Sequence, residues 1–128
     1  MIPVYKPFLD NNERKLILEA FDSSWISSKG DFIKKFENEL GKYTKRKNVI
    51  LVNNGTTALH VALLALDIGK GDQVITNSFS YVATSNAIKY VGAKPVFIDC
   101  DPNTWNIDLK KLEKKINNKT KAILVANV

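Results

Sequence analysis

The hydrophobic and polar positions between Val49 and Leu66 form the most informative pattern in this chain, VILVNNGTTALHVALLAL. An apolar run ends at Val52, two asparagines follow, and Gly55 opens a stretch that is apolar or small at almost every position. This succession predicts a strand at 49–52, a tight turn and a buried helix that begins near Thr56. The first turn of a helix leaves backbone N–H groups unpaired and carries a partial positive charge.

Two interpretations of that turn follow from the residues. Glycine allows the backbone to approach a ligand closely, and the hydroxyls of Thr56 and Thr57 stand beside Gly55, so the turn could cradle a phosphate group. Alternatively, Asn54 or Thr56 is only the N-cap of an ordinary helix. The segment has neither a GxGxxG pattern nor the lysine of a P-loop, so the residues alone leave both interpretations open.

Segments of helical and strand character alternate along the rest of the chain. Such alternation is typical of an α/β protein with a mainly parallel sheet, and the apolar runs are those of strands covered on both faces. Caps at Asp10 or Asn11 and at Asp108, and a terminating Gly92, set the helix boundaries. The pattern predicts helices up to about Phe21, from about Asp31 to Tyr43, from Tyr81 to Tyr90 and from Asp108 to Ile116, and strands at 73–77, 95–99 and 121–126.

Composition narrows the class of protein. The 128 residues suffice for one domain, and no apolar run is long enough to span a membrane, so no membrane partner is expected. The net charge of +6 could suit nucleic acid, but seventeen of the nineteen basic residues are lysines spread among glutamates on expected helix faces. We therefore expect solvated surface and no nucleic-acid partner. One cysteine and a start without signal-peptide character favour the cytoplasm.

Several residues that could suggest other chemistry have simpler explanations. His60, the only histidine, lies within an apolar helix and is expected to be structural. Asp99, Asp101 and Asp108 flank a Pro-Asn turn, and carboxylates in that setting usually cap turns and helices, so no metal site is expected. Cys100 follows an expected buried strand and is interpreted as a small apolar residue.

Six ordered blocks resemble a known family. They are WISSKG, NNGTTALHVAL, GKGDQVI, NSFSYVATSNAIKYVGAKPVFIDCD, TWNIDLKKLEKKI and TKAILVANV. Together they resemble the N-terminal part of the DegT/DnrJ/EryC1/StrS family of pyridoxal-phosphate (PLP) dependent nucleotide-sugar aminotransferases. WISSKG and TWNID are most similar to the perosamine-synthase branch. The resemblance covers essentially all 128 residues and implies an incomplete fold-type-I (aspartate-aminotransferase-like) large domain.

The resemblance also implies roles for particular residues. Gly55, Thr56 and Thr57 match the turn that holds the cofactor phosphate, and Tyr81 matches the aromatic residue that lies over the pyridine ring. From the residues alone, Tyr81 could equally be an amphipathic core residue. Ser27, Ser28 and Lys29 match a loop near the sugar substrate, although a plain interhelix loop with Gly30 as its turn residue explains them as well.

The family's catalytic residues are not matched in this chain. The lysine that anchors the cofactor and the aspartate that pairs with the pyridinium nitrogen follow the strand at which this sequence ends, and Asn127 stands where the family commonly has histidine. We therefore expect residues 1–128 to hold N-terminal helices and the first half of the large domain, truncated and inactive.

For the complete enzyme the resemblance implies PLP as cofactor, a 4-keto-6-deoxy nucleotide sugar and glutamate as substrates, and a homo-oligomer. The alternative is a non-catalytic remnant of the same family that binds phosphate or a partner. A free-standing nucleotide-binding domain is disfavoured, because the blocks follow the aminotransferase order.

Overall fold

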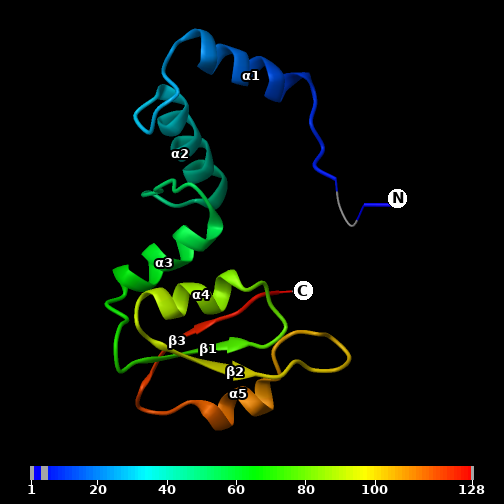
Figure 1. Ribbon diagram of the computed structural model, residues 1–128, viewed down its shortest axis with the longest axis vertical. Helices are drawn as coiled ribbons and strands as arrows, with labels where there is room; N and C mark the ends of the chain where they lie inside the picture. Colours follow the sequence, from blue (N-terminus) through cyan, green and yellow to red (C-terminus); the bar gives the residue numbers. More distant parts are fainter. Residues whose placement is uncertain (1, 4–5, 128) are drawn as a thin grey trace. The chain divides into compact units, whose positions relative to one another are not determined.

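The computed structural model describes residues 2–3 and 6–127 (Figure 1). The chain divides into two compact units, residues 1–51 and residues 52–128. Within the described residues, no helix has both the length and the apolar character needed to cross a membrane.

The first unit contains two helices, α1 (Asn11–Asp22) and α2 (Asp31–Thr44). The carboxylate of Asp10 accepts a hydrogen bond from the amide of Asn12 at 2.7 Å, and Glu13 reaches back to the Asp10 amide at 2.7 Å. This capping box satisfies amides that a helix start leaves free, which explains why α1 begins where the sequence predicts. Helix α2 ends at Lys45, whose φ of 55° lies in the left-handed region that commonly terminates helices.

The second unit is built on a parallel sheet of three strands in the described residues. They are β1 (Gln73–Asn77), β2 (Lys94–Ile98) and β3 (Thr120–Leu124), in the order β2-β1-β3. Both pairings are parallel, and Ile75 of β1 lies opposite Val96 and Ile123. The predicted mainly parallel sheet is therefore confirmed.

Helices cover the two faces of this sheet (Figure 1). Val74 and Ile75 point to opposite faces, as successive residues of a strand must. Val74 packs in a cluster with Leu63 of α3 (Gly55–Ala65) and with Ala87 and Ile88 of α4 (Ala83–Tyr90). On the other face, Ile75 packs with Ile98 and Ile107, and Leu112 of α5 (Leu109–Lys115) joins them.

The structure corrects the strand predicted at 49–52, which forms no strand. Ile50 is 79% exposed. A strand exists only through hydrogen bonds to a neighbour, and none of the strands in the described part of the chain pairs with this segment. An apolar run alone is thus insufficient to specify a strand.

Burial is also less complete than the apolar runs predict. In β1 four residues are buried, but β2 and β3 lie at the edges of the sheet, and Phe97 and Ile123 remain exposed. Helix α3 is predicted to be buried, yet only Leu63 is buried there. In each case one side of the element has no neighbour among the described residues, because a sheet edge or helix face needs a further element to cover it.

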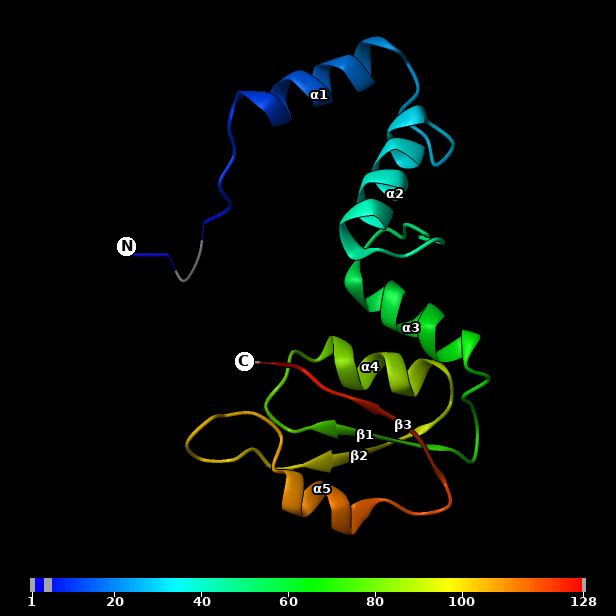
Figure 2. The same ribbon diagram turned by 180° about the vertical axis from the view of Figure 1, so that it is seen from behind.

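The candidate site residues of the second unit lie toward the carboxyl ends of the strands. Figures 1 and 2 show that the strands run in one direction and that α3 and α4 both begin on the side to which the strand arrows point. In open α/β sheets, ligands bind outside the carboxyl ends of the strands. A ligand site is therefore expected at the carboxyl ends of the strands.

Candidate functional site

The first turn of α3 carries backbone amides that are available to a ligand. Asn54 is the N-cap in extended conformation, and its Oδ1 accepts a hydrogen bond from the Thr57 amide at 2.9 Å. The Asn54 carbonyl accepts the Ala58 amide at 3.1 Å. The amides of Gly55 and Thr56 have no acceptor among the residues that the structure describes. Asn54 therefore caps the helix and still leaves two donors for an anion.

Gly55 leaves open space beside those two amides. A Cβ added at this position would meet no heavy atom within 4 Å. Its backbone is outside the left-handed region, so conformational freedom is not why glycine is needed here. The absence of a side chain instead lets a ligand approach the backbone closely. The hydroxyls of Thr56 and Thr57, both half-buried, make no hydrogen bond within the described ranges.

Tyr81 stands just before α4 with its ring in solvent. Among the residues that the structure describes, Tyr81 is 82% exposed. Its carbonyl accepts the Thr84 amide at 3.1 Å and the Thr84 hydroxyl at 2.8 Å. The backbone of Tyr81 is thus fixed while its ring is free to stack on a planar ligand.

Asn77, which the sequence analysis did not single out, lies at the carboxyl end of β1 and links it to the segment that follows β3. Its side chain is buried, and its Nδ2 donates to the Phe79 carbonyl at 2.6 Å and to the Ala126 carbonyl at 3.2 Å. Its Oδ1 accepts the Ala126 amide at 3.0 Å. A side chain thereby extends the pairing of β1 and β3 beyond the end of β3. The contact joins residues 49 apart in the chain, so no local sequence signal could predict it.

The loop before α2 holds the three candidate substrate residues. Ser27, Ser28 and Lys29 are exposed and belong to the first unit, whereas Gly55, Thr56, Thr57 and Tyr81 belong to the second. The Ser27 hydroxyl accepts the Lys29 amide at 3.3 Å, and its carbonyl accepts the Gly30 amide at 3.1 Å. A Cβ at Gly30 would lie 2.8 Å from the Trp25 carbonyl oxygen, so the turn requires glycine there.

His60 and three aspartates, for which the sequence analysis expects no catalytic or metal-binding role, make structural contacts. The ring of His60 lies 5.6 Å from that of Tyr90. Asp101 and Asp108 accept backbone amides and cap a turn and α5, as predicted, while Asp99 pairs with Lys111 at 3.0 Å instead. No cluster of three potential metal ligands occurs in the part of the chain that the structure describes.

Two charged groups in the segment that follows β2 have shifted pKa values. Amides of Thr104 and Asn103 donate to the Asp101 carboxylate and lower its pKa, because they stabilise its charged form. The hydrogen bond from Lys111 to Asp99 raises the pKa of the Lys111 ammonium. Both groups are at the surface and serve the loop between β2 and α5.

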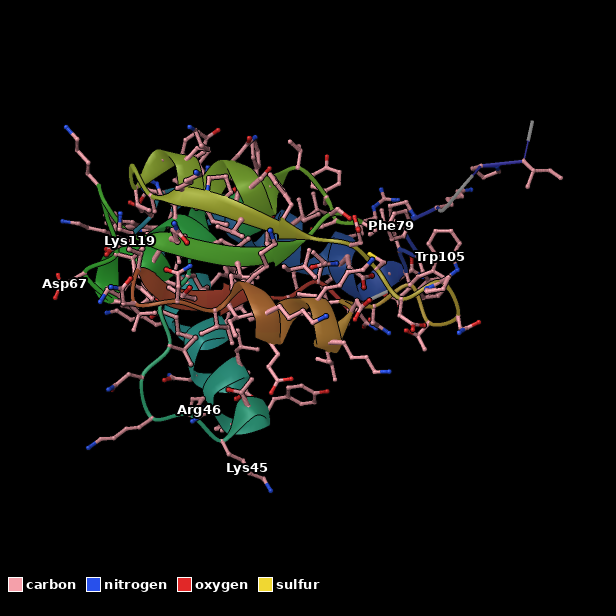
Figure 3. All side chains as sticks on the ribbon, turned by 90° about the horizontal axis from the view of Figure 1, so that it is seen from below. Lys45, Arg46, Asp67, Phe79, Trp105 and Lys119 are labelled. Carbon is pink, nitrogen blue, oxygen red and sulfur yellow. The ribbon has the colours of Figure 1, made fainter. Side chains whose placement is uncertain are left out.

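That loop also presents an aromatic contact that sequence reasoning missed. Figure 3 shows Phe79 and Trp105 side by side, and their ring centroids are 5.3 Å apart with a tilt of 50°. Trp105 has a φ of 60°, which is uncommon for a bulky residue, and its amide donates to the Asp101 carbonyl at 2.9 Å. The contact ties the loop after β2 to the loop after β1.

Comparison with known proteins identifies the relatives of this chain. The sequence profile of the DegT/DnrJ/EryC1/StrS aminotransferase family matches residues 7–128. GDP-perosamine synthase of Escherichia coli O157:H7 is 49% identical over 127 residues, which are 99% of this chain and 35% of the relative. GDP-perosamine synthase of Caulobacter vibrioides is 51% identical over 123 residues, 96% of this chain and 33% of the relative. The chain thus spans about a third of the length of these curated relatives.

Solved structures agree with the sequence relatives. A sugar aminotransferase of Streptococcus pneumoniae, Spr1654 in its PMP form, superposes with a TM-score of 0.90 at 34% identity, covering 97% of this chain and 31% of that protein. A GDP-4-keto-6-deoxymannose-3-dehydratase with a trapped PLP-glutamate geminal diamine gives a TM-score of 0.87 at 30% identity, covering 96% of this chain and 33% of the other.

These matches confirm the fold predicted from the resemblance. The α/β arrangement with its small parallel sheet is that of fold-type-I aminotransferases, of which the chain covers about a third. Relatives of this kind use PLP, and Spr1654 is also known in a PLP form. The chain belongs to the DegT/DnrJ/EryC1/StrS aminotransferase family.

Proposed function

We propose that this chain supplies the cofactor-phosphate turn and the ring-stacking residue of a PLP-dependent enzyme that transfers an amino group to a 4-keto-6-deoxy nucleotide sugar. Residues 1–128 would then be the N-terminal helices and the first half of the large domain. The observation that carries this proposal is the start of α3, where two free amides adjoin open space at Gly55. The perosamine-synthase relatives, 44–51% identical, support the substrate class.

The residues present fit a PLP phosphate. The amides of Gly55 and Thr56 and the hydroxyls of Thr56 and Thr57 are donors toward a dianion at the positive end of α3. The exposed ring of Tyr81 supplies a flat apolar surface for the pyridine. When bound, PLP supplies the electron sink for amino transfer. The chain's own residues bind and orient it.

The remaining assignments concern substrate and assembly. Ser27, Ser28 and Lys29 would contact the nucleotide sugar, since their exposed loop offers two hydroxyls and an ammonium group. Glutamate would donate the amino group, and the complete enzyme would be a cytoplasmic homo-oligomer.

Substitutions at the start of α3 in the full-length enzyme test the cofactor assignment. Gly55→Val should fold normally, because its side chain enters open space, but should block the phosphate and abolish retention of PLP. Thr56→Ala should weaken PLP binding by about 1.5–3 kcal/mol, the scale of a hydrogen bond to a charged group. Tyr81→Ala should lower retention less than Gly55→Val.

The measurement is PLP occupancy by absorbance after dialysis. Thr44→Ala, an exposed threonine of α2, is the matched control and should keep full occupancy. Wild-type occupancy in both Gly55→Val and Thr56→Ala would show that the start of α3 is only scaffold.

Residues 1–128 alone should have no transaminase activity, because no lysine here matches the family's cofactor-anchoring motif. Treatment with PLP and borohydride, followed by mass spectrometry, should label surface lysines without preference. A single stoichiometric label together with turnover of glutamate would contradict this. The second candidate function is that of a non-catalytic, phosphate-binding member of the family. It predicts that the full-length protein binds phosphate but has no transaminase activity.

A further inference from the structure

The turn before α3 contains the only Asn-Gly pair of the sequence, Asn54-Gly55. The side-chain amide of asparagine is one of the thermally labile groups of proteins. Its carbonyl carbon can be attacked by the main-chain nitrogen of the next residue, and glycine hinders that approach least because it has no Cβ. The structure shows whether both reacting groups are accessible here.

The nitrogen of Gly55 is available as a nucleophile. Its N–H has no acceptor among the described residues, because the first turn of a helix leaves its amides unpaired. A Cβ added at Gly55 would meet no heavy atom within 4 Å, so no neighbouring group stands over the residue. An amide inside a helix is held by the carbonyl four residues earlier, whereas the Gly55 amide can lose its proton to water.

The carboxamide of Asn54 is the matching electrophile. Its Oδ1 accepts the Thr57 amide at 2.9 Å, which folds the side chain back toward the first turn and polarises its carbonyl. Asn54 is exposed, and so are its neighbours Asn53 and Gly55, so water reaches the group. The side-chain carbonyl is therefore both activated and hydrated.

Ring closure requires only a local movement. Asn54 has an extended backbone, with φ −164° and ψ 169°, in which the Gly55 nitrogen does not face Cγ. A rotation about the Cα–C bond of Asn54 brings the two atoms together. This rotation gives up the bond from the Ala58 amide to the Asn54 carbonyl at 3.1 Å, at a helix end that frays readily, and it displaces no buried side chain.

We propose that Asn54 modifies itself through Gly55 when the turn holds no ligand. The Gly55 nitrogen forms a bond to Asn54 Cγ, the Cγ–Nδ2 bond breaks, and Nδ2 leaves as ammonia with the proton that Gly55 gives up. The product is a cyclic succinimide. Water then opens the ring at Cγ to give aspartate, or at the main-chain carbonyl to give isoaspartate. Water replaces ammonia overall, and nothing is oxidised or reduced.

The modification would control the cofactor site, a consequence that rests on the proposed function. Both products place a carboxylate at the N-cap of α3, beside the amides of Gly55 and Thr56, where it repels a phosphate dianion. Isoaspartate also lengthens the main chain by one methylene group. Conversely, a bound phosphate accepts the Gly55 N–H and blocks the nucleophile. A protein that loses its cofactor would thus change slowly into a form that cannot bind it again.

The test follows Asn54 in the full-length enzyme freed of cofactor. Peptide mapping by mass spectrometry measures the loss of the amide, and an isoaspartyl methyltransferase labels isoaspartate. Asn54 should be converted faster than Asn53, which is also exposed but precedes a residue with a side chain. The rate should rise with pH, because the nucleophile must lose a proton.

Gly55→Ala is the matched variant. Its methyl group enters open space, so the fold should be kept, but conversion of Asn54 should slow roughly tenfold because the Cβ hinders the attack. Equal rates in this variant and the wild type would overturn the proposal. So would an Asn54 that reacts no faster than Asn53, or a loss of the amide without isoaspartate, which would indicate direct hydrolysis.

A parallel incubation with PLP separates this proposal from the cofactor assignment. Conversion should fall to the fraction of enzyme that is free of PLP. Asn54→Asp should lower PLP retention and keep the melting temperature, since aspartate is also a good N-cap. If PLP gives no protection and Asn54→Asp retains it, the cofactor assignment fails and the modification stands. If Asn54 is stable without cofactor, the modification fails, and the occupancy of Gly55→Val still decides the cofactor assignment.

Discussion

At the scale of single residues, the loop between β2 and α5 contains an uncommon backbone conformation. Trp105 adopts a left-handed backbone, and 56% of its surface remains exposed although its ring contacts Phe79. Such a conformation costs energy for a bulky residue and persists only where neighbours impose it. Here Asp101 does so, because its carboxylate holds the amides of Asn103 and Thr104.

Acid should release this loop. The pKa of Asp101 is lowered in the folded state, chiefly by the Thr104 amide and then by that of Asn103. Its contribution to loop stability is therefore complete above the unfolded value of about 3.9 and is lost as pH falls through the lower folded pKa. In a Trp25→Phe background, the emission of Trp105 should shift to the red over that range.

Asp101→Asn is the control for that titration, because an amide oxygen can still accept both backbone bonds but does not ionise. Its emission should show no step in this range of pH. An identical step in the Asn variant would assign the transition to another group.

The residue scale also shows what sequence could supply. The caps at Asp10, Asn54 and Asp108 were predictable, because each acts on amides two or three residues away. The free amides of Gly55 and Thr56 agree with the predicted phosphate turn, but the binding roles stay predictions. The contact of Phe79 with Trp105 depends on distant neighbours and left no local signal.

At the scale of elements, one side chain joins β1 to the segment after β3 at the carboxyl ends of the strands. Asn77 uses its whole carboxamide, with two donated bonds and one accepted bond, to join β1 to the segment after β3. The same residue fixes the Phe79 carbonyl, two positions before Tyr81. Strand pairing and the placement of the stacking residue are therefore coupled through one buried group.

Asn77→Ala should destabilise the second unit by about 2–3 kcal/mol, because it leaves the Ala126 amide and two carbonyls without partners. Urea denaturation measures the loss, and hydrogen exchange of the Ala126 amide should accelerate more than that of Ile75 in the strand centre. Asn53→Ala, at an exposed asparagine, should change neither quantity. Unchanged exchange at Ala126 in Asn77→Ala would contradict this role.

Element prediction failed where partners were missing. The apolar residues at 49–52 have a strand's composition, but composition cannot specify which neighbour will pair with it. The burial of β2 and α3 was overestimated for the same reason. Helix boundaries set by local caps were predicted to within a residue or two, since a helix satisfies its own hydrogen bonds.

At the scale of the whole molecule, apolar side chains are exposed at the edge strand β3 and at the end of α3. Ile123 of β3 and Val125 beyond it are 45% and 44% exposed, and Leu64 and Leu66 at the end of α3 are 51% and 65% exposed. Edge strands with apolar side chains pair readily with other chains. We therefore expect residues 1–128 to self-associate in sedimentation velocity experiments.

Ile123→Lys should reduce this association, because a lysine on an edge strand opposes pairing. Ile50→Lys introduces the same charge at a more exposed position of the first unit and should have a smaller effect. A wild-type chain that stays monomeric at high concentration, with a cooperative melt, would contradict the expectation.

The central claim is that the start of α3 holds the cofactor phosphate, and the most direct measurement is a crystal structure of the full-length enzyme with PLP. The account predicts the phosphate at the first turn of α3, within hydrogen-bond distance of the Gly55 and Thr56 amides and a threonine hydroxyl, with the Tyr81 ring stacked on the pyridine. A phosphate bound elsewhere, with the Gly55 and Thr56 amides facing only water, would contradict it.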